Sequence, residues 1–326
     1  MEQEIKVSVI CNVYNHGKYV RDALEGFVSQ KTNFPYEVLV HDDASTDNSA
    51  EIIREYERKY PDIIKPIYQT VNQYSNGGAI ARRFQLPRAK GKYIALCEGD
   101  DYWTDPMKLQ KQFDFMEMNP SYSLCVCSTE WMNLRTGIRE NRCKIEEDMD
   151  ISLEEIILGK KGGFFQTASV FVKAEVYKCF PEWRTKFPIG DYPLWILAAL
   201  NGKVRMLHDV MTVYRYYAEN SWTVRMDNDE SRARISIRMI EGLNALNEAT
   251  EYRYSDVISQ RILQHKYTLA LMTHDLKMLR SDELKKMYKS RSFMFRASDV
   301  IRCKYPNMYT KFLKPLAKVV KSIHGE

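Results

Sequence analysis

The chain has 326 residues, of which 44% are hydrophobic and 28% are charged; this composition is that of a globular protein and excludes disorder of the whole chain. The net charge is only +5 and no nucleic-acid-binding module is recognisable, so we expect no nucleic-acid partner. The seven cysteines contain no CxxC pair, which argues against a disulfide framework or a zinc ribbon and predicts reduced thiols in the cytoplasm.

The N-terminal part of the chain alternates apolar strands with amphipathic helices. The strand segments are short apolar runs that end in polar loops, and the helical segments carry apolar residues at helical spacing. This alternation predicts an α/β fold with a mostly parallel sheet and helices on both faces. Strands are expected at Lys6–Cys11, Tyr36–Val40, Ile64–Tyr68 and Tyr93–Leu96, and helices at Tyr19–Ser29, Ala50–Lys59 and Ala79–Ala89.

The pattern becomes mixed after a helix at Met107–Met118, and it becomes helical from about Asp227 onward. We expect the mixed part to continue the same domain, which gives an α/β domain at residues 1–225 and a helical C-terminal region at residues 226–326. The strands of the mixed part are expected near Ser123–Ser128, Ala168–Val172, Val204–Leu207 and Met211–Tyr216.

Three loops follow predicted strands and are candidates for a ligand site. In an open α/β sheet, ligands bind beyond the carboxyl ends of the strands, and here these ends lead into Asn12–Gly17, Asp42–Asp47 and Glu98–Asp101. None of them carries a glycine-rich dinucleotide fingerprint or a P-loop. Two carry clustered carboxylates, which are ligands that suit Mg²⁺ or Mn²⁺ bound together with substrate phosphates. A metal held by carboxylates is therefore expected in place of a glycine-rich phosphate loop.

Each candidate residue also has a purely structural explanation. The alternative for Glu98–Asp101 is a solvated acidic turn that caps the helix near Met107, and Asp43 and Asp191 precede helices as N-cap residues often do. Tyr14 either stacks on a base or packs against the protein. Arg82 either meets a phosphate or lies on a solvated helix face. Local sequence alone leaves these alternatives open.

Five motifs in a distinctive order carry a resemblance to a known family. They are VSVICNVYN, EVLVHDDASTDNSAEII, AKGKYIALCEGDD, GDYPLW and VYRYY. Together they resemble the family 2 glycosyltransferases with a GT-A (Rossmann-like) fold, over about residues 5–225. The resemblance implies transfer of a sugar from a nucleoside-diphosphate donor, with inversion at the anomeric carbon.

The resemblance also implies roles for residues of the donor site. Tyr14 is expected to stack on the base, and Asp43 to accept a hydrogen bond from its imide N–H, which suits uracil. Asp100 is expected near the ribose, and Asp101 on a Mn²⁺ or Mg²⁺ ion that bridges the diphosphate. Arg82 matches an arginine of the family that contacts phosphate or sugar.

The acceptor side rests on Asp191, which matches the catalytic base of the family. An acceptor hydroxyl that attacks the sugar must lose its proton, and a carboxylate beside it can take that proton. Two positions depart from the family pattern. Glu98 stands where aspartate is more common. Many relatives have a histidine shortly after the Tyr-Arg pair, whereas Tyr214-Arg215-Tyr216-Tyr217 has a tyrosine at that place, so no metal or phosphate role is expected for a histidine there.

The expected function is that of a metal-dependent, inverting hexosyltransferase-type glycosyltransferase. The expected donor is a UDP-sugar, and the acceptor is a saccharide or a lipid-linked saccharide in the synthesis of a bacterial surface polysaccharide. Two alternatives stay open. One is a nucleotidyltransferase of related fold, although its basic glycine-rich loop is missing at Asn12–Lys18. The other is a catalytically inactive relative that serves as a scaffold.

The ends of the chain bear on its location. Met1–Glu4 lacks the basic flank of a signal peptide, and no apolar run approaches the about 18 residues of a membrane span, so we expect a cytoplasmic protein. Residues 281–326 hold eleven Lys or Arg against four Asp or Glu. Within them, Phe312–Ile323 predicts a basic amphipathic helix. This helix either packs on the catalytic domain or binds the inner face of the cell membrane as a peripheral anchor.

Overall fold

The computed structural model describes residues 4–142, 145–159, 165–219, 221–309 and 311. The chain divides into two compact units, one formed by Met1–Pro181 with Ile189–Val224 and the other by Glu182–Pro188 with Arg225–Glu326. A single domain boundary after residue 225 stays a prediction. That boundary does not anticipate that the short segment Glu182–Pro188 groups with the second unit.

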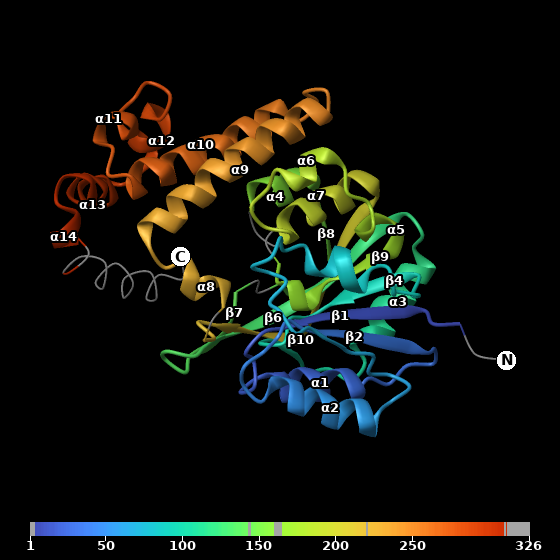
Figure 1. The fold of residues 1–326 in the computed structure, drawn as a ribbon. Helices are drawn as coiled ribbons and strands as arrows, with labels where there is room; N and C mark the ends of the chain where they lie inside the picture. Colours follow the sequence, from blue (N-terminus) through green and yellow to red (C-terminus); the bar gives the residue numbers. More distant parts are fainter. Residues whose placement is uncertain (1–3, 143–144, 160–164, 220, 310, 312–326) are drawn as a thin grey trace. The chain divides into compact units, whose positions relative to one another are not determined.

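A mixed sheet forms the centre of the first unit (Figure 1), and in the described residues it has ten strands. The strands are β1 (Val7–Val13), β2 (Tyr36–Asp42), β3 (Ile67–Tyr68), β4 (Tyr93–Leu96), β5 (Tyr102–Trp103), β6 (Tyr122–Asn133), β7 (Arg139–Asn141), β8 (Met149–Ile151), β9 (Phe171–Lys173) and β10 (Lys203–Tyr216). Their order is β3-β2-β1-β4-β9-β6-β10-β5, with β7 beside β6 and β8 beside β10.

The strands that carry the predicted loops are parallel. β1 pairs in parallel with β2 and β4, β2 pairs in parallel with β3, and β6 pairs in parallel with β10. β9 lies antiparallel between β4 and β6. The expected α/β fold with a mostly parallel sheet is therefore confirmed, with antiparallel strands added in its C-terminal half.

Helices cover both faces of the sheet, as predicted (Figure 1). Residues of α1 (Val20–Val28), α2 (Ser49–Lys59) and α3 (Lys108–Met118) join one core cluster with the inward side chains of the central strands. The opposite face carries α4 (Leu153–Leu158), α5 (Ala174–Tyr177) and α7 (Asp191–Asn201). Because both faces are covered, β1 and β2 are buried along almost their whole length and do not alternate between buried and exposed residues, although β2 includes Glu37, His41 and Asp42.

Several expected elements differ in the structure. The strand expected at Ile64–Tyr68 is only Ile67–Tyr68, and the strand expected at Ala168–Val172 is only Phe171–Lys173, after a 3₁₀ helix at Thr167–Ser169. The helix expected at Ala79–Ala89 contains only a π-helical turn, Ala81–Gln85. The buried Gln85 side chain explains the tight turn, because its Nε2 donates to the carbonyls of Cys11 and Leu39 at 3.0 and 2.7 Å. The two strands expected at Val204–Leu207 and Met211–Tyr216 form one long β10, and the gap between them is an irregularity in its pairing with β6.

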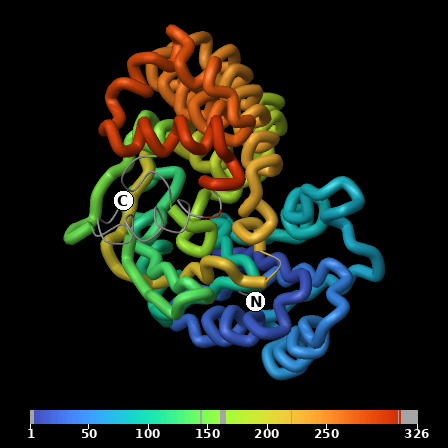
Figure 2. The backbone as a smooth tube through the Cα atoms, turned by 90° about the vertical axis from the view of Figure 1, so that its left-hand side faces the viewer, coloured from blue at the N-terminus to red at the C-terminus, as the bar shows by residue number. Residues whose placement is uncertain are grey.

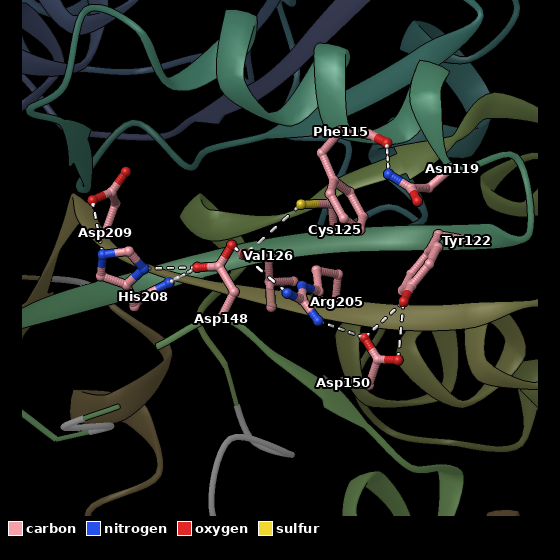
Figure 3. A network of polar contacts seen from close by, with 10 residues as sticks. All are labelled: Phe115, Asn119, Tyr122, Cys125, Val126, Asp148, Asp150, Arg205, His208 and Asp209. Atoms are coloured by element: carbon pink, nitrogen blue, oxygen red, sulfur yellow. Dashed lines mark hydrogen bonds and ion pairs between the residues drawn. The ribbon is translucent and has the colours of Figure 1, made fainter. Parts of the chain in front are cut away.

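A polar network holds the edge strand β8 to β10 and β6 (Figure 3). Arg205 Nη1 lies 3.0 Å from Asp150 Oδ1, and the Tyr122 hydroxyl donates to the same carboxylate at 2.9 Å. His208 Nδ1 lies 2.7 Å from Asp148 Oδ1, and this hydrogen bond raises the pKa of His208. His208 belongs to the irregular segment of β10, so the network holds this segment to Asp148 where the pairing with β6 is interrupted.

The second unit is helical. Its helices are α6 (Glu182–Thr185), α9 (Asp229–Ala249), α10 (Ser255–Met272), α11 (Leu276–Leu279), α12 (Lys285–Ser290), α13 (Phe293–Lys304) and α14 (Pro306–Met308), and α8 (Trp222–Arg225) lies at the junction with the first unit. α9 and α10 lie side by side (Figures 1 and 2). A small core of Tyr267, Ala270, Leu279, Leu284 and Cys303 joins α10 to the short helices that follow.

The structure describes the residues for one of the two predictions about membranes and not for the other. In the described part of the chain, no helix combines the length and the apolar character that a bilayer crossing requires. The basic amphipathic helix expected at Phe312–Ile323 lies outside the described residues.

Candidate functional site

The three candidate loops meet at one edge of the sheet. The carboxyl ends of β1 and β2 lie at the same level, since Val13 pairs with Asp42. β4 pairs with β1 on the side opposite β2, where Ile10 pairs with Leu96. The chain builds outward from β1 to β2 and β3 on one side and continues with β4 on the other. This reversal of strand order creates the crevice in which α/β sheets bind ligands.

Backbone and side-chain hydrogen bonds join the first loop to the second. The Asn15 N–H donates to Ser45 Oγ at 3.0 Å, and Asn15 Oδ1 accepts from the Thr46 N–H at 2.7 Å. The His16 N–H donates to Ser49 Oγ at 2.9 Å. Asn15 has a positive φ of 56°, a conformation that asparagine tolerates better than most residues. The two loops thus form one connected rim.

Asp43 lies in this rim, and its carboxylate fixes a third segment. Its two oxygens accept the N–H groups of Gln73 and Tyr74 at 2.7 and 2.9 Å. Its own N–H donates to the carbonyl of Val13 at 2.9 Å. The N-cap of α2 is Asn48, so the carboxylate of Asp43 organises the rim and does not cap the helix. Tyr14 follows Val13 directly and is exposed.

Gly99 brings the acidic loop Glu98–Asp101 against the first loop. The Gly99 N–H donates to the Asn12 carbonyl at 2.9 Å. A Cβ at this glycine would lie 2.8 Å from Val13 Cγ2 and 2.9 Å from His16 Nδ1, distances that no side chain tolerates without displacement. The close approach of the two loops therefore requires glycine at position 99.

Arg215 at the end of β10 holds the acidic loop from the other side. Its backbone N–H donates to Asp101 Oδ1 at 2.8 Å, and its Nη1 donates to the Asp100 carbonyl at 2.9 Å. Its Nη2 forms an ion pair with Asp22 of α1. Burial, followed by the charge of Asp100, raises the pKa of Asp101. Asp101 is only 3% exposed, whereas Asp100 is half-buried, so the Asp100 carboxylate is the more accessible of the two.

Asp191 is close enough to the acidic loop to influence its charge. It is the first residue of α7, is half-buried, and accepts a hydrogen bond from Thr167 Oγ1. Burial, followed by the negative charges of Asp191 and Asp100, raises the pKa of Glu98 to about 8. The α7 N-cap is Gly190, without a capping side chain. Thr167 thus orients Asp191 beside a crowded group of carboxylates.

Arg82 is not joined to the loops in the same way. It is exposed, and its guanidinium lies over the ring of Phe180 at 4.6 Å from the centroid. The neighbouring Arg83 is the one connected to the rim, since its Nη2 donates to Gln73 Oε1 at 2.9 Å. A phosphate or sugar contact by Arg82 stays a prediction.

Several buried polar atoms of the crevice lack a hydrogen-bond partner among the described residues. They are Asn12 Oδ1 and Asp42 Oδ1, near the carboxyl ends of β1 and β2, and His16 Nδ1 in the loop after β1. Buried polar groups are almost always satisfied by protein, water or ligand. Their grouping at the switch point fits a site that receives a polar ligand such as a nucleotide.

The acidic loop also fits a divalent cation. No group of three or more His, Cys, Asp or Glu side chains is arranged to hold a metal within the described ranges. Mg²⁺ and ions like it commonly bind through one or two carboxylates and complete their shell with substrate phosphates and water. Glu98, Asp100 and Asp101 supply oxygen ligands of this kind, and their mutual repulsion favours a cation near them.

The roles of Arg215 and Asp22 were missed from the sequence. The VYRYY motif pointed to the family but not to the partners of Arg215. β10 pairs with β5, which follows the acidic loop, and this pairing brings Arg215 to Asp100 and Asp101. Tyr214, one residue earlier, packs edge-on against Trp131 of β6 at 4.7 Å between ring centroids. The aromatic residues of the motif therefore pack on the sheet, whereas its arginine serves the site.

Comparisons with known sequences agree with this geometry. The model of the family described as "Glycosyl transferase family 2" matches residues 8–179, more than half of the chain. An uncharacterised Mycobacterium bovis protein is 35% identical over 223 residues, which cover 66% of this chain and 60% of that protein. TuaG of Bacillus subtilis, a glycosyltransferase named for teichuronic acid biosynthesis, is 37% identical over 110 residues, which cover 34% of this chain and 41% of TuaG. This chain thus spans less than two thirds of the length of these relatives.

Solved structures share the fold. Staphylococcus aureus TarS 1–349 in complex with UDP-GlcNAc superposes with a TM-score of 0.54 at 19% identity, covering 91% of this chain and 87% of that one. The mannosyltransferase PcManGT from Pyrobaculum calidifontis, in complex with GDP-Man and Mn²⁺, gives 0.55 at 15% identity, covering 95% and 89%. At these identities the likeness shows the fold alone.

Proposed function

Because the chain belongs to glycosyl transferase family 2, we propose that it moves a sugar from a UDP-sugar donor to a hydroxyl group of a saccharide or lipid-linked saccharide, with inversion at the anomeric carbon. The observation that carries this proposal is the convergence of Asp43, the acidic loop and Asp191 on the switch point of the sheet. Helix capping by individual carboxylates would not explain why these carboxylates meet at one place. The matched parts cover less than two thirds of the length of these relatives. The activity of the whole protein is therefore also a proposal.

The rim formed by the first two loops is proposed to hold the nucleoside. Tyr14 is exposed beside Asp43 and can stack on the base. Asp43 is held in place by two backbone N–H groups, and a carboxylate oxygen has a further lone pair for the imide N–H of uracil. The complexes of TarS with UDP-GlcNAc and of PcManGT with GDP-Man support a nucleotide-sugar as the donor.

The acidic loop is proposed to serve the ribose and a Mn²⁺ or Mg²⁺ ion. We assign the ribose to Asp100 and the cation to Asp101, with Arg215 fixing the loop. The accessible carboxylate of Asp100 makes it a second candidate for the cation. Such an ion, when bound, stabilises negative charge on the departing diphosphate. The Mn²⁺ of the PcManGT complex supports this assignment.

Asp191 is proposed to act as the general base. The acceptor oxygen attacks the anomeric carbon from the face opposite the diphosphate, a new C–O bond forms, and the bond to the diphosphate oxygen breaks. The acceptor proton moves to the carboxylate of Asp191, which Thr167 orients through its hydroxyl group. Direct displacement of this kind inverts the anomeric configuration.

The acceptor is proposed to belong to a bacterial surface polysaccharide. TuaG is named for teichuronic acid biosynthesis, and a relative from Bacillus spizizenii is named a poly(ribitol-phosphate) beta-glucosyltransferase. A lipid-linked acceptor would place the enzyme on the inner face of the cell membrane. In that setting a peripheral contact with lipid would keep the enzyme near its substrate.

The replacement Asp191→Asn tests the assignment of the base. We expect UDP binding to be unchanged and sugar transfer to fall by about 10²–10⁴-fold, because the amide cannot accept the proton. The measurement is UDP release from candidate UDP-sugars with and without acceptor polysaccharide. The matched control is Asp209→Asn, whose carboxylate pairs with His208 in the network of Figure 3. Sugar transfer by Asp191→Asn at the native rate would contradict the assignment.

A further inference from the structure

Three consecutive large apolar side chains are exposed where α13 begins. Phe293 and Met294 are 77% and 76% exposed, and Phe295 is 36% exposed. Exposed apolar residues are ordinary when they are scattered singly, whereas three in succession in the first turn of a helix make a candidate interaction site. We refer to Lys285–Phe295, which includes α12 and the start of α13, as the corner.

The position of these side chains is fixed by the inner face of α13. Asp299 and Cys303, one helical turn apart, are buried. Asp299 Oδ2 accepts from the Tyr267 hydroxyl at 2.6 Å and pairs with Arg291 Nε at 3.0 Å. Because this buried contact sets the rotation of the helix, Phe293 and Met294 cannot turn inward without breaking it. Their exposure is therefore part of the packed unit.

The sequence on both sides of the apolar group is positively charged. Between Leu284 and Ser298 the sequence has five Lys or Arg and no Asp or Glu. Arg291 is used internally by Asp299, and Lys285 lies 3.2 Å from Asp282. Lys286 and Lys289 are exposed on α12. The corner thus presents aromatic and thioether side chains next to cations that face solvent.

This combination fits a lipid surface better than the other occupants. Apolar side chains enter the boundary between headgroups and acyl chains, while lysines meet anionic headgroups. A second copy of this chain would bring two groups of like charge together, which opposes self-association. An apolar protein groove would leave the lysines without partners of opposite charge.

We propose that the corner docks on an anionic lipid surface, with Phe293 and Met294 inserted among the headgroups and Lys286 and Lys289 at lipid phosphates. This inference goes beyond sugar transfer and does not depend on it. It also concerns a surface different from the helix expected at Phe312–Ile323.

Flotation of the full chain with vesicles tests the proposal. We expect binding to vesicles that contain phosphatidylglycerol, weak binding to phosphatidylcholine alone, and a decrease at high salt. The double replacement Phe293→Ser with Met294→Ser, and separately Lys286→Gln with Lys289→Gln, should each weaken binding by about tenfold or more. The matched control is Met118→Ser, because Met118 is 74% exposed on α3 of the other unit.

Several outcomes would overturn the proposal. These are absence of binding by the native chain, equal binding by the Phe293/Met294 variant, or loss of all binding in a chain that ends at Tyr309 and keeps the corner. Light scattering that shows a dimer lost in the same variant would make the corner a self-association surface instead. Thermal melting and UDP titration of each variant report folding and donor binding, so a failure of the proposed function is distinguished from a failure of this inference.

Discussion

Arg215 is the residue on which several parts of the site depend. It contacts Asp101 through its backbone, the Asp100 carbonyl through Nη1 and Asp22 through Nη2. Its guanidinium also lies 4.3 Å from the centroid of the Tyr102 ring. The planar fork reaches the Asp100 carbonyl, the Asp22 carboxylate and the Tyr102 ring together, and a lysine ammonium cannot; the backbone contact with Asp101 does not depend on the side chain. The arginine thus links α1, β10 and the acidic loop.

Arg215→Lys should therefore weaken metal-dependent UDP binding by about tenfold or more while leaving the fold intact. The charge is kept, but the acidic loop loses its fixed position. Calorimetric titration of UDP at several Mn²⁺ concentrations measures the effect. The control is Arg205→Lys, which replaces a paired arginine in the network of Figure 3. Equal effects of the two replacements would contradict a positioning role for Arg215.

At the scale of elements, the acidic loop depends on its contact with the first loop. Gly99→Ala places a methyl group 2.8 Å from Val13 Cγ2 and 2.9 Å from His16 Nδ1. We expect the loops to separate and UDP binding to fall by about tenfold. Gly190→Ala is the matched control, because its added Cβ would meet nothing within 4 Å. UDP binding by Gly99→Ala at the native affinity would show that the two loops need not be in contact.

The helix α3 carries a buried lysine that makes stability depend on pH. Lys108 Nζ donates to Gln112 Oε1 at 2.8 Å and lies 4.2 Å from the Trp103 ring centroid. Burial lowers the pKa of Lys108 below its ordinary value. Between the two values the unfolded chain binds more protons than the folded one, so folding stability rises with pH through this window.

Lys108→Met removes this dependence. We expect the melting temperature of the variant, relative to that of the native chain, to fall as the pH rises toward the ordinary pKa of lysine, because only the native chain gains stability in this window. Differential scanning calorimetry in matched buffers measures the difference. A melting temperature of the variant that stays constant or rises relative to that of the native chain, as the pH rises, would contradict the lowered pKa of Lys108.

Much of the element order was predictable because it depends on local patterns. β4 was predicted with both of its ends, since Tyr93–Leu96 is an apolar run between polar neighbours. The turn at Ala81–Gln85 was not, because its shape depends on bonds from Gln85 to carbonyls of β1 and β2. The two-residue strand β5 likewise exists only through its pairing with β10.

For the whole molecule, the family resemblance supplied more of the site than periodicity did. The motifs predicted the α/β fold and the family, and both are confirmed. The neighbourhood of Asp191 and Glu98 could not be derived from spacing, because it depends on how α7 packs on the strands of the sheet. The roles of Tyr14, Asp43, Arg82, Asp100, Asp101 and Asp191 stay predictions.

The most direct test of a metal-assisted UDP-sugar site is calorimetric titration of UDP, GDP and CDP against the full chain, with and without Mn²⁺. We predict that UDP binds more tightly than the other two and that Mn²⁺ strengthens its binding, because base recognition by Asp43 and charge neutralisation at the acidic loop both contribute. Absence of binding by any of the nucleotides would contradict the account and would favour a scaffold without donor binding.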